Sequence, residues 1–124
     1  MFENLVIAIQ ENDLQNIKDH LTKYKSISKD IVYYSYLYNR PQIVEFFIEK
    51  GYFILDEYIY VVLYKDNIET LKYLLENNYI DWTPEYLDKA LDSFYFVSSC
   101  KKCLEYLKKN GYKVNRNKKL DNLK

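Results

Sequence analysis

The sequence predicts an all-α fold, a solenoid of about four stacked helix-turn-helix repeats. Apolar residues recur at helical spacing within short segments, and these segments recur about every 27 residues along the chain. The 124 residues also contain only two glycines and two prolines, which does not suit β-sandwiches or glycine-rich phosphate loops. We therefore expect one repeat domain over residues 1–115, followed by a basic C-terminal tail over residues 116–124.

Each repeat contains two apolar segments, and both keep the same register. In the second segments, IVEFFIEKGYF aligns with TLKYLLENNYI, which places Val44 and Leu71 one period apart. The same step back reaches Ile17, while the step from Leu71 forward to Leu104 is longer. The first segments keep the period as well, and they begin at Leu5, Val32, Ile59 and Leu87. The approximate repeats are residues 4–29, 30–55, 56–82 and 83–115.

The second segments have the pattern of amphipathic helices. In residues 68–76, apolar side chains recur at three- and four-residue steps and charged side chains occupy the other face. The first segments are apolar almost all round, as is typical of a helix sandwiched between neighbours. Pro41 and Asp56 are expected where helices begin. Glycine and asparagine, which tolerate the left-handed conformation, are expected to end the second helices at Lys50-Gly51, Asn77-Asn78 and Asn110-Gly111.

This pattern resembles the ankyrin repeat family. The family's second helix ends in the pattern I/V-V-x-x-L-L-E-x-G, which residues 43–51 and 70–78 follow and residues 104–115 fit. The resemblance covers about residues 4–115. The family's T-P-L-H start is absent, and the period of about 27 is shorter than the family's period of about 33. The resemblance implies a mostly helical stack with shortened loops, and another helical-hairpin array is the alternative.

The resemblance also implies a binding surface, lined by the first helix of each repeat. Mapped onto this chain, the middle repeats contribute Tyr34, Leu37, Tyr38, Val61, Tyr64 and Lys65. Exposed tyrosines are enriched among the residues that dominate binding energy, since they offer large contact area at low entropic cost. The alternative is that these rings fill space in the core, where the family has a pair of alanines.

The last repeat carries an aromatic insertion, FYFV, at residues 94–97. Because a solenoid needs its ends covered, the insertion is interpreted as a cap over the end of the stack. The alternative is that Phe94, Tyr95 and Phe96 contact a partner or a second copy of the chain.

The chain offers little for catalysis, so we expect no enzyme activity, no cofactor and no metal. His20 is the single histidine, and it lies at a position where other repeats have apolar residues. Cys100 and Cys103 have the CxxC spacing of zinc ligands, but a zinc site needs four ligands and no second such pair is present. We expect plain thiols near the start of a helix, and carboxylates on solvated faces.

Lys and Arg number 18 and Asp and Glu number 18, so charge gives no general attraction to nucleic acid or anionic membranes. The chain has no apolar run of the roughly 20 residues that a membrane span needs, and its start is a poor secretory signal. We expect a cytoplasmic protein. The basic tail leaves a weak contact with nucleic acid as an alternative.

The sequence therefore predicts a non-catalytic protein–protein interaction module, a small adaptor or inhibitor that occludes a partner protein. Enrichment in residues with A- and T-rich codons, including 15 tyrosines, favours an AT-rich source such as a virus or phage. Such a protein would act as an antagonist of a host factor. The alternative is a self-assembling structural protein that buries its aromatic patch between copies.

Overall fold

The structure is a computed structural model that describes residues 2–93 and 100–115. Over these residues it is entirely helical, which confirms the all-α part of the prediction. The helices are α1 (Phe2–Gln10), α2 (Leu14–Tyr24), α3 (Lys29–Leu37), α4 (Pro41–Glu49), α5 (Asp56–Tyr64), α6 (Ile68–Glu76), α7 (Pro84–Ser93) and α8 (Lys101–Lys109).

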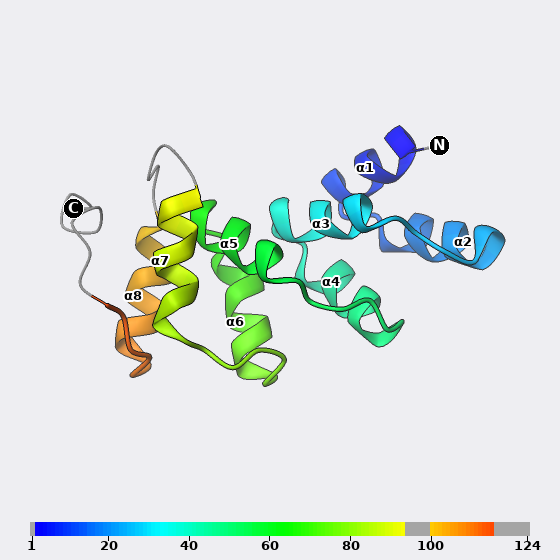
Figure 1. The fold of residues 1–124 in the computed structure, drawn as a ribbon. Helices are drawn as coiled ribbons and strands as arrows, with labels where there is room; N and C mark the ends of the chain where they lie inside the picture. Colours follow the sequence, from blue (N-terminus) through cyan, green and yellow to red (C-terminus); the bar gives the residue numbers. More distant parts are fainter. Residues whose placement is uncertain (1, 94–99, 116–124) are drawn as a thin grey trace.

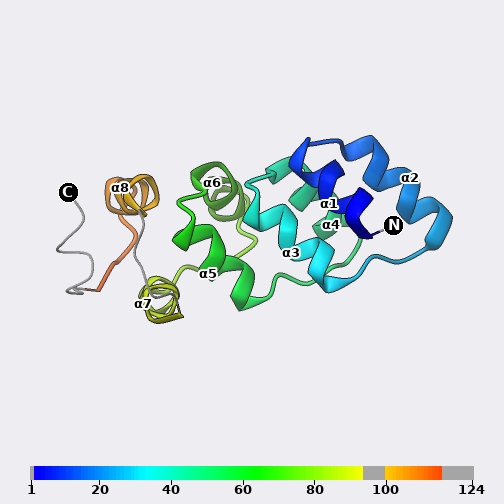
Figure 2. The same ribbon diagram turned by 90° about the horizontal axis from the view of Figure 1, so that it is seen from above.

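The helices form two rows. Helix α1 packs on α2, α3 on α4 and α5 on α6, so the first six helices are three hairpins. Odd-numbered helices also pack on one another, from α1 to α3, α5 and α7, and in the even-numbered row α4 packs on α6 and α6 on α8. The result is an elongated molecule with the N-terminal hairpin at one end and α8 at the other (Figure 1), and Figure 2 shows the rows from above.

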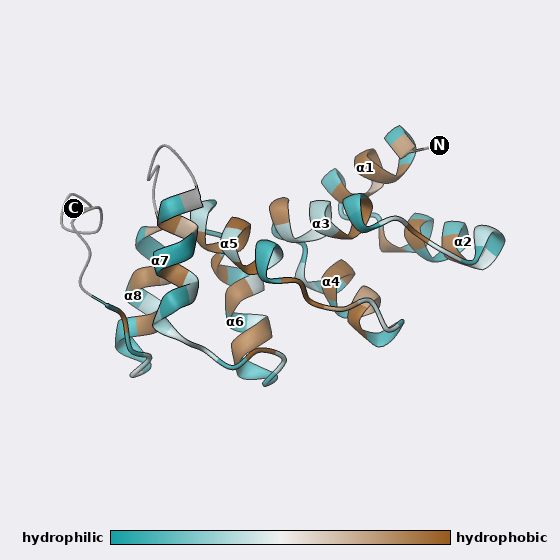
Figure 3. Cartoon of the chain, in the orientation of Figure 1, coloured by the Kyte–Doolittle hydropathy of each residue, from teal (hydrophilic) through white to brown (hydrophobic). Residues whose placement is uncertain are grey.

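The core runs along the length of the molecule between the two rows. Helix α5 lies between α3 and α7, and it is hydrophobic along much of its length beyond its acidic first turn (Figure 3). The rings of Tyr36 and Tyr58 stack with centroids 4.7 Å apart, and both side chains are at most 1% exposed. Two of the many tyrosines are therefore core residues that join α3 to α5, and such ring pairs contribute about 0.5–1.5 kcal/mol beyond their burial.

The helices end in left-handed residues, as the glycines and asparagines predict. After α4, Gly51 has a φ of 89°, and the amide of Tyr52 donates to the carbonyl of Phe47 at 3.0 Å. Asn78 and Gly111 take the same place after α6 and α8. Each of these ends is a Schellman motif, which satisfies carbonyls that a helix end otherwise leaves unpaired.

The turn inside each hairpin also ends its first helix in a left-handed residue, at Asn12, Asn39 and Asp66. The residue that follows this position reaches back to the preceding hairpin. Arg40 donates from Nε to the carbonyl of Ile9 at 3.0 Å and from its guanidinium to the carbonyl of Gln10. One repeat later, Asn67 donates from Nδ2 to the carbonyls of Tyr36 and Leu37 at 2.8 and 2.9 Å. The two donors occupy equivalent positions of successive repeats, and so do their acceptors.

The left-handed residues themselves reach forward to the even-numbered helix that follows their own hairpin. Asn39 accepts through Oδ1 from the amide and hydroxyl of Thr70, at 3.0 and 2.8 Å. Asp66 accepts from the amides of Lys102 and Cys103, at 3.2 and 2.8 Å. Both side chains thus cap the first turn of the second helix in the following unit, where amides have no partner within their own helix.

The two hydrogen bonds that Asn67 donates predict how much stability is lost when its side chain is truncated. Asn67→Ala leaves the carbonyls of Tyr36 and Leu37 without their donor in a partly buried site. We expect the free energy of unfolding to fall by about 1–3 kcal/mol, measured by urea denaturation followed by far-UV circular dichroism. Asn77→Ala is the matched control, because the exposed side-chain amide of Asn77 donates to the carbonyl of Tyr73, one turn earlier in the same hairpin. We expect this variant to lower the free energy of unfolding by less than about 0.5 kcal/mol. Equal losses of stability in Asn67→Ala and Asn77→Ala would contradict the conclusion that Asn67 stabilises the contact between hairpins.

The buried tyrosine pair predicts a loss of stability in alkali. Burial, and secondarily the neighbouring Tyr58, raises the pKa of Tyr36 well above its ordinary value of about 10. The unfolded chain therefore releases this proton first as the pH rises above about 10, so the free energy of unfolding falls there. Tyr36→Phe has no proton to release, and we expect a smaller drop in stability between about pH 7 and pH 11 than in the wild type. Parallel pH profiles for the two proteins would contradict this assignment.

Candidate interaction surfaces

An aromatic surface lies on α1 and α3. The rings of Tyr34 and Tyr38, one helical turn apart, stack with centroids 5.9 Å apart. Phe2 approaches Tyr34 edge-on at 6.2 Å, and its side chain is 46% exposed. We call the surface made by Phe2, Ile7, Tyr34, Leu37 and Tyr38 the aromatic face.

The aromatic face is held in place before any partner arrives. Gln10 on α1 donates from Nε2 to the hydroxyl oxygen of Tyr38 at 2.9 Å, which ties the ring to the neighbouring helix. Ile7, 47% exposed, lies one turn before Gln10 on the same side of α1. A preformed surface loses little conformational freedom on binding, so more of its contact energy is available for affinity.

The residues predicted to bind a partner do not all lie on the surface of the structure. Tyr34, Leu37 and Tyr38 are half-buried on α3 and share one surface, and Lys65 is exposed at the end of α5. Val61 differs from the prediction: its side chain is 2% exposed and belongs to the core. Helices α3 and α5 both have neighbours on two sides, but the side chain of Val61 is much shorter than that of Tyr34 at the equivalent position of the preceding repeat, so Val61 is covered and Tyr34 is only half-buried.

Tyr64 is half-buried at the end of α5. Together with Leu87, Ala90 and Leu91 of α7 it lines a small enclosed space between α5 and α7. This placement agrees with the alternative that some of the tyrosines fill space between helices. Phe94, Tyr95 and Phe96 and the tail 116–124 lie outside the described residues.

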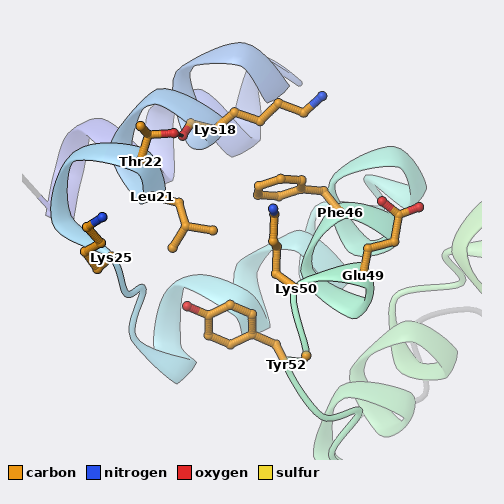
Figure 4. A pocket seen from close by; sticks show the side chains of 9 residues that line it. Lys18, Leu21, Thr22, Lys25, Phe46, Glu49, Lys50 and Tyr52 are labelled. Atoms are coloured by element: carbon orange, nitrogen blue, oxygen red, sulfur yellow. Dashed lines mark hydrogen bonds between the residues drawn. The ribbon is translucent and has the colours of Figure 1, made fainter.

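A second surface, which the sequence did not predict, is a groove between α2 and α4. It has a volume of about 740 Å³ (Figure 4). Leu21 of α2 faces Phe46 and Lys50 across it, and Tyr52 lies at its lower end in this view. The hydroxyl oxygen of Tyr52 accepts from the amide of Ile27 at 2.9 Å, so this end of the groove is fixed to the segment that follows α2.

Two lysines from different helices converge in this groove. The ammonium group of Lys18 on α2 lies 5.8 Å from the centroid of the Phe46 ring, and that of Lys50 lies 5.7 Å from it. Contacts of this kind contribute about 0.5–1 kcal/mol at exposed sites, and an ion pair between exposed side chains contributes about 0–1 kcal/mol. Both lysines are exposed, so either can exchange its ring contact for a carboxylate at little net cost.

Phe53 is the most exposed of the large apolar side chains in the described part of the chain, at 85%. It follows Tyr52 in the segment between α4 and α5, outside the aromatic face. Single exposed apolar side chains are common on protein surfaces, so this residue alone defines no site.

The two cysteines lie at the start of α8, the location that the sequence predicted, and both are buried free thiols. Burial, with a smaller effect of the Asp66 carboxylate, raises the pKa of Cys100 to about 11, and the same causes raise the pKa of Cys103. Both thiols are protonated near neutral pH, which is the unreactive form. His20 is half-buried against the ring of Tyr24, with centroids 4.6 Å apart.

The Glu69 carboxylate takes part in a contact between hairpins, where it accepts from the side chain of Asn39 at 2.8 Å. The hydrogen bond from the Asn39 side chain lowers the pKa of Glu69, opposite to the shift that a general acid requires. Among residues 2–93 and 100–115, no group of three or more histidines, cysteines and carboxylates could hold a metal ion. No helix in the same residues combines the length and apolar character that crossing a bilayer requires.

Comparison with known proteins gave no relative: no protein family, no curated protein and no solved structure matches this chain. The two surfaces are therefore interpreted from their own geometry and chemistry.

The raised thiol pKa values predict slow labelling. At about pH 8, a thiol with a pKa of about 11 is far less ionised than an ordinary cysteine with a pKa near 8.5. We expect the folded protein to react with dithionitrobenzoate at least about tenfold more slowly than an exposed thiol, since each pKa unit is a factor of ten. Glu105→Cys, on the exposed side of α8, supplies that thiol as an internal control. A wild-type rate equal to the control, or no acceleration in denaturant, would contradict burial of the pair.

Proposed function

We propose that this chain is an ankyrin-like solenoid that acts as a non-catalytic protein-binding module. Two features support the architecture: helical hairpins pack side by side, and the hydrogen bonds between them recur at equivalent positions of successive repeats. In such an array each unit buries its apolar side against its neighbours, leaving one row of helices for recognition.

The observation that carries the binding function is the aromatic face. Tyr34 and Tyr38 stack on each other and continue into Phe2, a side chain that is 46% exposed. Water covers part of this aromatic surface in the isolated chain, and a partner that displaces it gains the burial of large, preformed rings. Tyrosine is over-represented among residues that dominate interfaces.

The mechanism we propose is occlusion by a rigid surface. The aromatic face binds an apolar anchor on a partner protein and thereby blocks or recruits that partner, as an adaptor or inhibitor in the cytoplasm. Self-assembly is the second candidate, favoured by the exposure of Phe2 and Ile7, because two copies could cover one another's apolar side chains.

A double truncation tests this function. Tyr34→Ala/Tyr38→Ala removes both stacked rings, and loss of one interface hot spot typically costs about 2 kcal/mol or more. We expect affinity for the physiological partner to fall at least about tenfold, measured by capture from a lysate of the source cells and then by titration with the purified partner.

Tyr24→Ala/Tyr79→Ala is the matched control, since it removes two exposed tyrosines that lie away from the aromatic face. Both variants should melt cooperatively before they are compared. Equal capture by wild type and Tyr34→Ala/Tyr38→Ala would refute the assignment of this surface. A wild-type mass in solution above that of the monomer, restored to the monomer in the same variant, would identify self-assembly instead.

A further inference from the structure

We propose that the groove between α2 and α4 binds an acidic peptide segment of another protein. The peptide's carboxylates would pair with Lys18 and Lys50, and one apolar side chain would rest on Leu21 and Tyr52. This surface belongs to the even-numbered helices, whereas the aromatic face belongs to α1 and α3, so the proposal goes beyond the function proposed above.

The groove exists because the even-numbered row is not packed evenly. Helix α4 packs on α6 and α6 on α8, whereas α2 and α4 are separated by a space of about 740 Å³. This volume falls within the roughly 300–1,000 Å³ that is typical of ligand sites. Tyr52, fixed by its hydrogen bond from the Ile27 amide, keeps the lower end of the groove in place without a ligand.

The charge of the groove selects the chemistry of its ligand. Its lining carries Lys18, Lys25 and Lys50 against one carboxylate, that of Glu49, although positive and negative residues balance at 18 each in the whole chain. Positive charge is thus concentrated here. Because the Lys18 and Lys50 ammonium groups flank a single ring, carboxylates on one short segment can reach both.

The apolar part of the lining favours a peptide over other anions. Leu21 points into the groove beside Phe46 (Figure 4), so a ligand that only carried charge would leave this surface unused. A flat membrane touches the rim of a groove and not its floor, and anionic membranes usually engage clusters of about four to eight basic residues. Nucleic acid requires a longer track of phosphate contacts than three lysines provide. An acidic peptide with an apolar side chain matches both the positive charge of the lysines and the apolar surface of Leu21 and Phe46.

A random peptide library displayed on phage tests the proposal. It is selected on the full-length wild type, on Lys18→Glu/Lys50→Glu, and on Lys72→Glu/Lys89→Glu. The last variant is the matched control: it changes the net charge equally, and Lys72 also lies over an aromatic ring, 5.5 Å from the centroid of Tyr106, outside the groove. We expect peptides enriched on the wild type and on the control to carry a surplus of Asp and Glu around one leucine or aromatic residue.

Fluorescence anisotropy with the most enriched peptide then measures affinity. We expect binding to weaken at least about tenfold in Lys18→Glu/Lys50→Glu, to be unchanged in the control, and to fall with rising salt. Should the glutamate variant fail to melt cooperatively, Lys18→Met/Lys50→Met takes its place, because it removes the charges and keeps the aliphatic stems. The proposal is overturned if no peptide depends on these lysines, or if the enriched peptides are neutral or basic. It is equally overturned if phosphatidylserine vesicles or a single-stranded oligonucleotide bind through the same lysines and the acidic peptide does not.

Discussion

The architecture depends on the turn between the two helices of each hairpin. Two successive residues there connect three units: Asn39 caps a helix in the following hairpin, while Arg40 donates to carbonyls of the preceding one. Asp66 and Asn67 repeat this arrangement one unit later. A left-handed residue is required at the first position because the chain must reverse there, and only Asn, Asp or Gly adopts that conformation readily. Conformation and hydrogen bonding therefore select the same residue types, and both act at the boundary between units.

The helical period explains how α3 divides its tyrosines between core and surface. Tyr34 and Tyr38 are one helical turn apart and share an outer side of α3, whereas Tyr36, between them, points the opposite way and stacks on Tyr58. The contacts that Arg40 and Asn67 make to the ends of α1 and α3 fix the spacing of these first helices. The spacing allows Phe2 to reach Tyr34 and Gln10 to reach Tyr38. Stability and the proposed recognition surface thus rest on the same helix.

Local patterns predict this fold well, and tertiary packing decides what they leave out. The helices follow from three- and four-residue apolar spacing, and their ends from Gly51, Asn78 and Gly111, because both are properties of neighbouring residues. The burial of Val61 could not be predicted, since it depends on how closely the neighbouring helices approach α5 around a short side chain. The groove between α2 and α4 could not be predicted from the sequence either. Lys18 and Lys50 do not occupy equivalent positions of the repeat, and their convergence depends on how far α2 lies from α4.

The two surfaces lie on the same pair of hairpins, which gives the remaining helices a distinct part in the molecule. The aromatic face uses α1 and α3, and the groove uses α2 and α4. Helix α5 adds the buried Tyr58 that stacks on Tyr36, and α6 adds Thr70, which donates to Asn39. In a linear array each unit is stabilised by its nearest neighbours, so the third hairpin determines how firmly the second is held. In the described part of the chain α7 packs mainly on α5 and α8 on α6, so changes beyond α6 act on the two proposed surfaces mainly through the third hairpin.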